Sequence, residues 1–295
     1  MARGLDARED ARRVDGAGHP VYSAGRAAGR GPARLWRRGR SGSTERPAAR
    51  RRGRAQSWER RVKDLGDGPG NGIFNAIPPG VSALAVLIFG VELMFQLAEA
   101  GLLGPDKRVG FRIAVIADWG VYAPVLDYMI ENHVWPLRQL ARFVVYPFIH
   151  GGFLHALIAT AMLLALGRMV GQAFGSVVAV AVFMLSAVAG ALAYALALET
   201  RLPLFGAFPG IYGLIGGYSL IMWHVTALTG EPRWKAFQLI LMLAGLQLVF
   251  APIGGAGREW VADLVGFATG FALTAALSPA GRAAIRGTLA RLRRR

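Results

Sequence analysis

Six long apolar stretches dominate the sequence and limit the folds that it can adopt. We place them near residues 80–102, 148–170, 176–198, 207–228, 235–253 and 260–278. Each is long enough to cross a hydrocarbon layer about 30 Å thick as an α-helix. Helix is the expected conformation, because a segment inside a membrane must satisfy its own backbone hydrogen bonds. The stretches therefore predict an all-α polytopic membrane protein with six transmembrane helices.

The basic residues gather at the two ends of the chain. The net charge is +16, and residues 1–70 and 281–295 carry all of it, so that residues 71–280 are neutral. Basic flanks remain on the cytoplasmic side of a membrane. Six spans put both termini on one side, so we expect a multi-pass protein, in a bacterial inner membrane, with both termini in the cytoplasm. The predicted parts are a basic N-terminal tail, a transmembrane domain and a basic cytoplasmic C-terminal tail.

The N-terminal part, residues 1–70, is rich in Arg, Gly, Ala and Ser. It has too few large aliphatic side chains to offset the entropy lost on ordering, so we expect it to be disordered. Such a tail either binds acidic lipid head groups or nucleic acid, or is simply solvated. These residues can also result from the assignment of a start codon upstream of the true one. The sequence shows neither a recognition-helix pattern nor a basic patch interleaved with aromatic residues, so we expect no nucleic-acid partner.

Some chemistries are excluded by composition. The chain has no cysteine, which excludes disulfides, thiolate catalysis and Cys-ligated metals. The sequence also lacks the HExxH pattern of zinc peptidases. We therefore expect no cofactor and no metal.

The connection at residues 103–147 is too regular for a plain loop. Part of it reads VLDYMIENHVWPLRQLARFVVYPF, in which apolar and polar residues alternate at helical spacing. Its aromatic side chains are typical of a membrane–water boundary; they are Trp119, Tyr122, Tyr128 and Trp135. We therefore predict interfacial helices that lie partly in the bilayer. The alternative is a soluble loop with aromatic residues in its core.

Three ionisable residues in the apolar region are candidates for a functional site, because charge at membrane depth is costly. His150 and His155 are five residues apart, which separates them by roughly 140° around a helix and argues against a metal site. The alternative is that both hydrogen-bond the backbone near a helix end. Asp263 lies near a predicted helix start. It is either exposed and stabilised by the helix dipole, or buried with a partner or a proton.

Glycines recur at intervals of four in three of the predicted spans. Small residues at this spacing allow membrane helices to approach closely. The candidate packing glycines are Gly167, Gly171, Gly175, Gly213, Gly217, Gly266 and Gly270. They predict a compact bundle, although chance spacing is the alternative in a chain with 39 glycines.

Several segments together resemble the rhomboid family of intramembrane serine proteases. The family's tract into its second helix resembles ARFVVYPFIHGGFLHAL, with His150 and His155 in register. Its Gly-x-Ser-Gly-x-x-Tyr-Gly segment, which opens the fourth helix, resembles GAFPGIYGLIGGY, with Tyr212 in register. Its sixth-helix Ala-His-x-x-Gly-x-x-x-Gly resembles ADLVGFATG, from Ala262 onward. The similarity extends over about residues 80–280.

The resemblance implies a six-helix rhomboid bundle whose first loop is partly embedded in the membrane. In active members a Ser on the fourth helix attacks a peptide carbonyl and a His on the sixth is the base. A His and an Asn on the second helix bind the oxyanion. Here the nucleophile position is Phe208, followed by Pro209, and the base position is Asp263; the oxyanion positions are His150 and Ala159. Phenylalanine has no nucleophilic atom, and proline has no N–H to donate.

These departures favour one function and leave two alternatives. The first is a proteolytically inactive rhomboid that binds the lipid bilayer and transmembrane segments of client proteins. The second is an intramembrane serine-type endopeptidase that uses an unconventional residue, for which the nearest hydroxyl is Tyr212. A third is a small transporter or channel with a polar path, although the inverted repeat typical of transporters is absent from the sequence. In each of these functions, five residues are candidates for a binding or structural role. They are His150, His155, Pro209, Tyr212 and Asp263.

Overall fold

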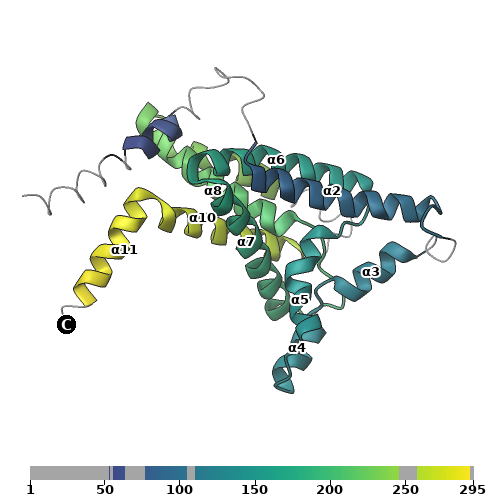
Figure 1. Cartoon of the computed structure of the whole chain (residues 1–295). Coiled ribbons are helices and arrows are strands. Elements are labelled where there is room, and N and C mark those ends of the chain that lie inside the picture. The colour runs from purple at the N-terminus through teal and green to yellow at the C-terminus, as the bar shows by residue number, and fades with distance from the viewer. Residues whose placement is uncertain (1–52, 54–55, 64–76, 105–109, 246–257, 293–295) are drawn as a thin grey trace, which may run out of the picture. The chain divides into compact units, whose positions relative to one another are not determined.

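The computed structural model describes residue 53 and residues 56–63, 77–104, 110–245 and 258–292. Five of its helices are long and apolar enough to cross a membrane (Figure 1). They are α2 (Pro79–Glu99), α6 (Phe153–Phe174), α7 (Ser176–Ala197), α8 (Phe208–Thr229) and α10 (Trp260–Leu277). These helices match five of the six predicted spans and confirm the all-α membrane fold.

The fifth predicted span, residues 235–253, is described only in part. The short helix η3 (Arg233–Phe237) leads into a helical segment at 238–245. The rest of this predicted span lies outside the described residues. The total of six spans therefore remains a prediction.

Close backbone contacts hold α8 and α10 together. A Cβ on Gly270 would overlap the carbonyl oxygen of Gly213, and a Cβ on Gly266 would overlap that of Pro209. Glycines on α6 also lie at contacts: a Cβ on Gly167 would lie 2.7 Å from the side chain of Val81 on α2. Helix approach at this range requires residues without a side chain. The predicted compact packing is therefore present in these helices.

Three other glycines complete the predicted set. Gly171 meets the ring of Pro78, and Gly217 lies between Val170 and Thr274. Gly175 is different, because a Cβ there would meet no atom within 4 Å. Its φ of +102° instead lets the chain turn from α6 into α7, a conformation that glycine adopts without steric cost. The prediction that Gly175 packs helices is therefore wrong.

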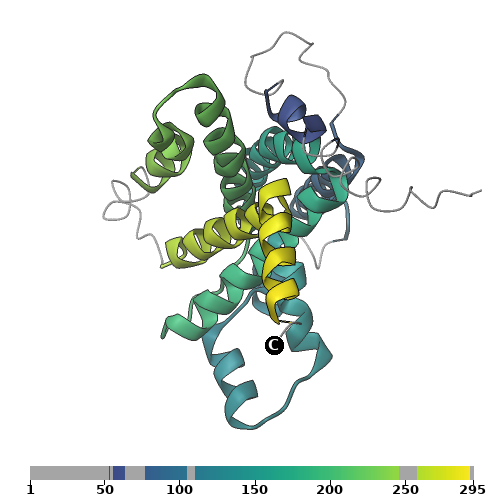
Figure 2. The same ribbon diagram turned by 90° about the vertical axis from the view of Figure 1, so that its left-hand side faces the viewer.

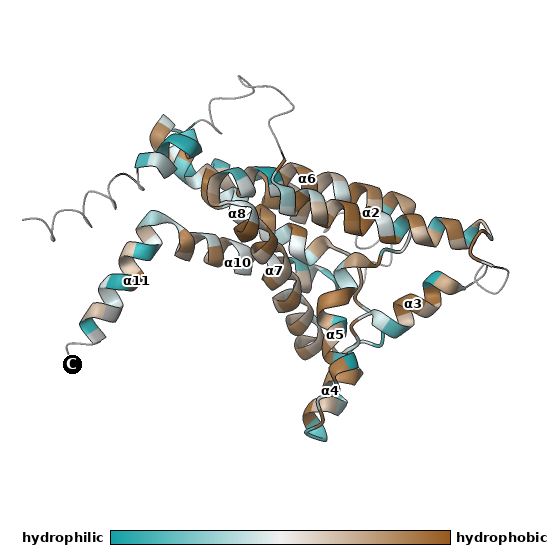
Figure 3. Cartoon of the chain, in the orientation of Figure 1, coloured by the Kyte–Doolittle hydropathy of each residue, from teal (hydrophilic) through white to brown (hydrophobic). Residues whose placement is uncertain are grey.

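The first connection contains three short helices, as its spacing predicts. They are α3 (Phe111–Trp119), α4 (Ala123–Glu131) and α5 (Leu137–Val145), followed by the 3₁₀ turn η2 (Tyr146–Phe148). Several large apolar side chains of this region are exposed, and they include Ile113, Tyr128, Trp135 and Leu137. Figure 3 colours much of these short helices as hydrophobic. Such a surface fits the predicted position of these helices at the membrane boundary.

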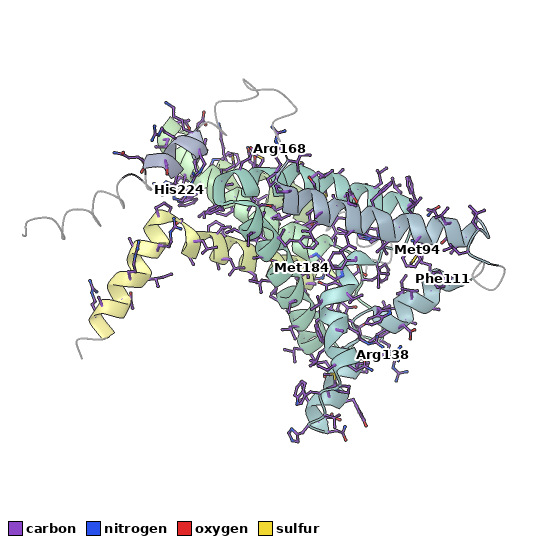
Figure 4. All side chains as sticks on the ribbon, viewed as in Figure 1. Met94, Phe111, Arg138, Arg168, Met184 and His224 are labelled. Atoms are coloured by element: carbon purple, nitrogen blue, oxygen red, sulfur yellow. The ribbon has the colours of Figure 1, made fainter. Side chains whose placement is uncertain are left out.

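A short helix at residues 56–63 lies within the predicted N-terminal tail. Trp58 and Val62 are one turn apart on it and are both buried. The Trp58 ring lies 4.7 Å from that of His224 and 6.2 Å from that of Phe174, measured between centroids. His224 is labelled beside this helix in Figure 4. Disorder is therefore a wrong prediction for residues 56–63; most of the remaining tail lies outside the described residues.

We expect Trp58→Ala to release this helix from the bundle, because Trp58 supplies its largest buried contact. Amide hydrogen exchange over residues 56–63 should accelerate by on the order of tenfold or more, as local opening becomes easier. Arg61→Ala is the matched control, since Arg61 is exposed on the same helix. Equal exchange in the two variants would show that Trp58 does not dock the helix.

Candidate functional site

The candidate site lies where the chain enters α8. Leu204 forms an isolated antiparallel bridge with Val121, with N–O distances of 2.8 and 3.0 Å. The next turn places the Gly206 N–H 3.1 Å from the carbonyl oxygen of Tyr146. Gly206 has a φ of +97°, and a Cβ there would lie 3.1 Å from the His155 ring. Glycine is therefore required both by the backbone conformation and by the adjacent imidazole.

His150 and His155 meet at this entry segment. His150 lies between η2 and α6 and not within a helix, so the expected angular separation of the two residues does not apply. Their ring centroids are 5.0 Å apart, in an edge-to-face arrangement. His150 Nε2 accepts a long hydrogen bond from Ala207 N at 3.4 Å, and His155 Nδ1 accepts one from Gly151 N at 3.4 Å. His155 thus contacts the backbone just before α6, and His150 contacts the backbone at the start of α8.

Phe208 begins α8 and packs on a histidine. Its ring stacks on that of His155, with centroids 5.2 Å apart and planes 18° apart. The imidazole that stacks on the nucleophile position is therefore that of His155, and not that of His150, which the resemblance places at an oxyanion position. The reason is local: His155 belongs to the first turn of α6, whereas His150 precedes that helix.

Pro209 fills the space beside Phe208. It occupies the first turn of α8, where a missing N–H leaves no helical hydrogen bond unmade. A Cβ on Gly190 of α7 would lie 2.9 Å from Pro209 Cβ, and Gly266 of α10 faces the Pro209 carbonyl. Pro209 is therefore wedged between α7 and α10.

The other sequence-predicted residues are buried. Asp263 lies in the first turn of α10 and is 4% exposed. It interacts electrostatically with Tyr146 and Tyr212. Desolvation raises the pKa of Tyr146, and the charge of Asp263 raises it further. Ala159, at the oxyanion Asn position, is fully buried in the apolar core.

A buried ion-pair network supports the site from the first connection. Arg112 on α3 donates to both carboxylate oxygens of Glu92 on α2, at 2.7 and 2.9 Å. It also donates to Glu99 at 2.8 Å and to the carbonyl oxygen of His150 at 2.9 Å. Desolvation lowers the pKa of Arg112, but the hydrogen bonds to the two glutamates outweigh it and raise the pKa overall. The network thus joins α2 and α3 to the backbone of His150.

Arg142 ties the first connection together in a similar way. Its guanidinium donates to the carbonyl oxygens of Ala117 at 3.1 Å and Gly120 at 2.8 Å. Burial lowers the pKa of Arg142. Sequence reasoning found neither Arg112 nor Arg142. The available signal was Glu92, since a carboxylate in an apolar span requires a partner.

The nucleophile position offers no atom that could attack a carbonyl carbon. The ring at the nucleophile position is hydrocarbon, and the following residue lacks an N–H for an oxyanion. Two surface pockets, of about 460 and 210 Å³, are lined by other residues. Within the part of the chain that the structure describes, no group of three His, Asp or Glu side chains could hold a metal ion.

Comparison with known proteins now places this architecture. The family model of the rhomboid domain matches residues 137–280, a region that begins at α5 and includes α6, α7, α8 and α10. No curated protein matches the chain. The matched region contains His150, His155, Phe208 and Asp263. The chain therefore belongs to the rhomboid family of multi-pass integral membrane proteins.

Proposed function

We propose that the protein is a proteolytically inactive rhomboid that binds transmembrane segments of client proteins. The observation that carries this proposal is the stacking of Phe208 on His155 at 5.2 Å. A serine hydroxyl at this position would need a base within hydrogen-bond reach. Here the aromatic ring of Phe208 occupies the position and stacks on the imidazole of His155. Asp263 would have no nucleophile to activate.

The surroundings of Phe208 also favour an inactive protein. Pro209 packs against Gly190 and Gly266, so that the first turn of α8 is tightly enclosed. Active members carry an oxyanion-binding Asn at the position that is Ala159 here, and the methyl group of Ala159 is fully buried. The site thus differs from an active one at the nucleophile, at the base and at one of the two oxyanion donors.

Exposed apolar side chains give the protein surfaces for client segments. Leu154 and Ile158 on α6 lie one turn apart and are 67% and 45% exposed. Leu154 adjoins His155, so this strip begins beside the candidate site. The bilayer itself covers such surfaces, and a client helix can replace lipid there through close packing.

The orientation and the division of the chain are part of the same proposal. Both basic termini lie in the cytoplasm, and the membrane is a bacterial inner membrane. The transmembrane domain comprises residues 71–280, with basic segments before and after it. Charge supports this orientation, since residues 281–295 contain six arginines and no acidic residue. We propose no nucleic-acid partner, cofactor or metal.

A serine-directed fluorophosphonate probe tests the absence of catalysis. We expect no labelling of the full chain in membranes, and no cleavage of a model transmembrane substrate. The candidate hydroxyls for an unconventional nucleophile are Ser186 and Tyr212, which Ser186→Ala and Tyr212→Phe would remove. Labelling or cleavage that disappeared in either variant would establish the protease function and overturn the proposal.

Client binding is tested by photo-crosslinking in native membranes. A photoreactive amino acid at Leu154 should form adducts with transmembrane segments of other proteins. The matched control is the same amino acid at Leu196, which is 63% exposed on α7. Adducts with lipid alone at Leu154, or the same proteins at both positions, would contradict a specific client surface beside His155.

A further inference from the structure

The C-terminal segment forms a basic helix directly after the last span. Helix α11 (Pro279–Leu292) follows α10 after the single residue Ser278 (Figure 1). It contains Arg282, Arg286 and Arg291 and no acidic residue. All three arginines are exposed, and Ile285 between them is 46% exposed. Helix α11 thus presents positive charge and some apolar surface that the described part of the protein does not cover.

The junction with α10 is well defined. Ser278 Oγ donates to the carbonyl oxygen of Ala275 at 2.7 Å and accepts from the N–H of Gly281 at 3.1 Å. A Cβ on Gly281 would overlap the Ala275 carbonyl oxygen. The start of α11 is therefore packed against the end of α10, as Figure 2 lets the reader follow. The direction of α11 is set at this turn.

The short junction keeps the arginines close to a membrane surface. Arg282 is five residues beyond Leu277, the last residue of α10. A helix rises about 1.5 Å per residue, so Arg282 lies within about 8 Å of the end of the span along the chain. The Debye length at physiological ionic strength is also about 8 Å. The positive charge of Arg282 therefore lies close enough to interact with lipid head groups. Arg286 lies one helical turn further along α11.

We propose that α11 lies against the surface of a membrane that contains anionic lipids, with Arg282 and Arg286, one turn apart on one face, contacting the lipid phosphates. Arg291 lies on the opposite side of the helix and adds positive charge near the same surface. Charge complementarity identifies this partner, because the helix has only basic charge. A guanidinium binds phosphate oxygens with paired hydrogen bonds. The exposed Ile285 side chain supplies apolar contact at the same surface.

A single spin label tests this proposal in the full chain. The sequence has no cysteine, so Thr288→Cys provides one attachment site on α11. The labelled protein is placed in nanodiscs of phosphatidylcholine alone, or with 30% phosphatidylglycerol. Collision of the label with a neutral, water-soluble nickel chelate is then measured. We expect collision to fall severalfold in the anionic nanodiscs, and to recover when NaCl rises from 50 to 500 mM.

Two triple variants distinguish the effect of charge on membrane contact from an effect of the substitutions on folding. Replacing the three arginines by glutamine should remove most of the difference between the two lipid compositions, since only the three arginines that follow α11 in the sequence then remain. Each basic residue near an anionic membrane strengthens binding about fivefold. Removing three of them should therefore lower the affinity of α11 for the anionic membrane by more than tenfold. Replacing them by lysine keeps the charge and should retain most of the difference. Equal collision rates in the two nanodiscs, or an unchanged difference in the glutamine variant, would overturn the proposal.

Discussion

Replacing Arg112 by alanine should lower the free energy of unfolding by about 3–5 kcal/mol, the range for breaking a buried ion pair. Glu92 is 1% exposed, and both of its carboxylate oxygens accept hydrogen bonds from Arg112. In the variant, Gln96 would remain as a donor at 2.8 Å, and the carboxylate would stay buried without a counterion. Thermal or steric-trap unfolding of the full chain measures this loss.

Arg138→Ala is the matched control for that experiment. Arg138 lies on the outside of α5 (Figure 4) and pairs with Asp118 at 3.2 Å, with both side chains about 60% exposed. An exposed pair contributes about 1 kcal/mol or less. Replacing both Arg112 and Glu92 by leucine should recover most of the loss, since no charge then remains buried. If Arg112→Ala and Arg138→Ala cost the same, the network does not stabilise the fold.

The positions of the helices could be predicted because each span carries its own signals. The apolar run of α2 begins after Pro78, and that of α10 ends at Ser278 before Pro279, so the observed bounds lie close to the predicted ones. A membrane strengthens such local signals, because the helix has to satisfy its backbone within the segment. The glycine rows were predictable for a similar reason, since their spacing follows the helical repeat.

Contacts between distant segments could not be predicted in this way. Arg112 and Glu92 are 20 residues apart, and no local pattern joins them. Trp58 is buried against Phe174 of α6 and His224 of α8, which are distant from it in the sequence. The relation of His150 to His155 was missed because it depends on where α6 begins. The apolar pattern places the start of this span near residue 148, whereas α6 begins at Phe153, so that His150 lies outside the helix and His155 lies in its first turn.

Replacing Gly270 by leucine should have the second large effect, a loss of about 3 kcal/mol or more. Inserting side chains into a packed core typically costs about 1–3 kcal/mol, and more when the neighbours cannot move. A Cβ on Gly270 would overlap the carbonyl oxygen of Gly213, which belongs to the backbone of α8. The two helices would have to separate, and the first turn of α8, which carries Phe208 and Pro209, would move with them.

Gly90→Leu provides the control, because Gly90 is exposed on α2 and a Cβ there would meet no atom within 4 Å. Removing a glycine from a helix interior favours the helix by up to about 1 kcal/mol. The control should therefore leave the unfolding free energy unchanged or raise it slightly. A comparable loss in both variants would mean that leucine is tolerated poorly anywhere in these spans. A loss confined to Gly270 would show that α8 is held in place by its backbone contact with α10.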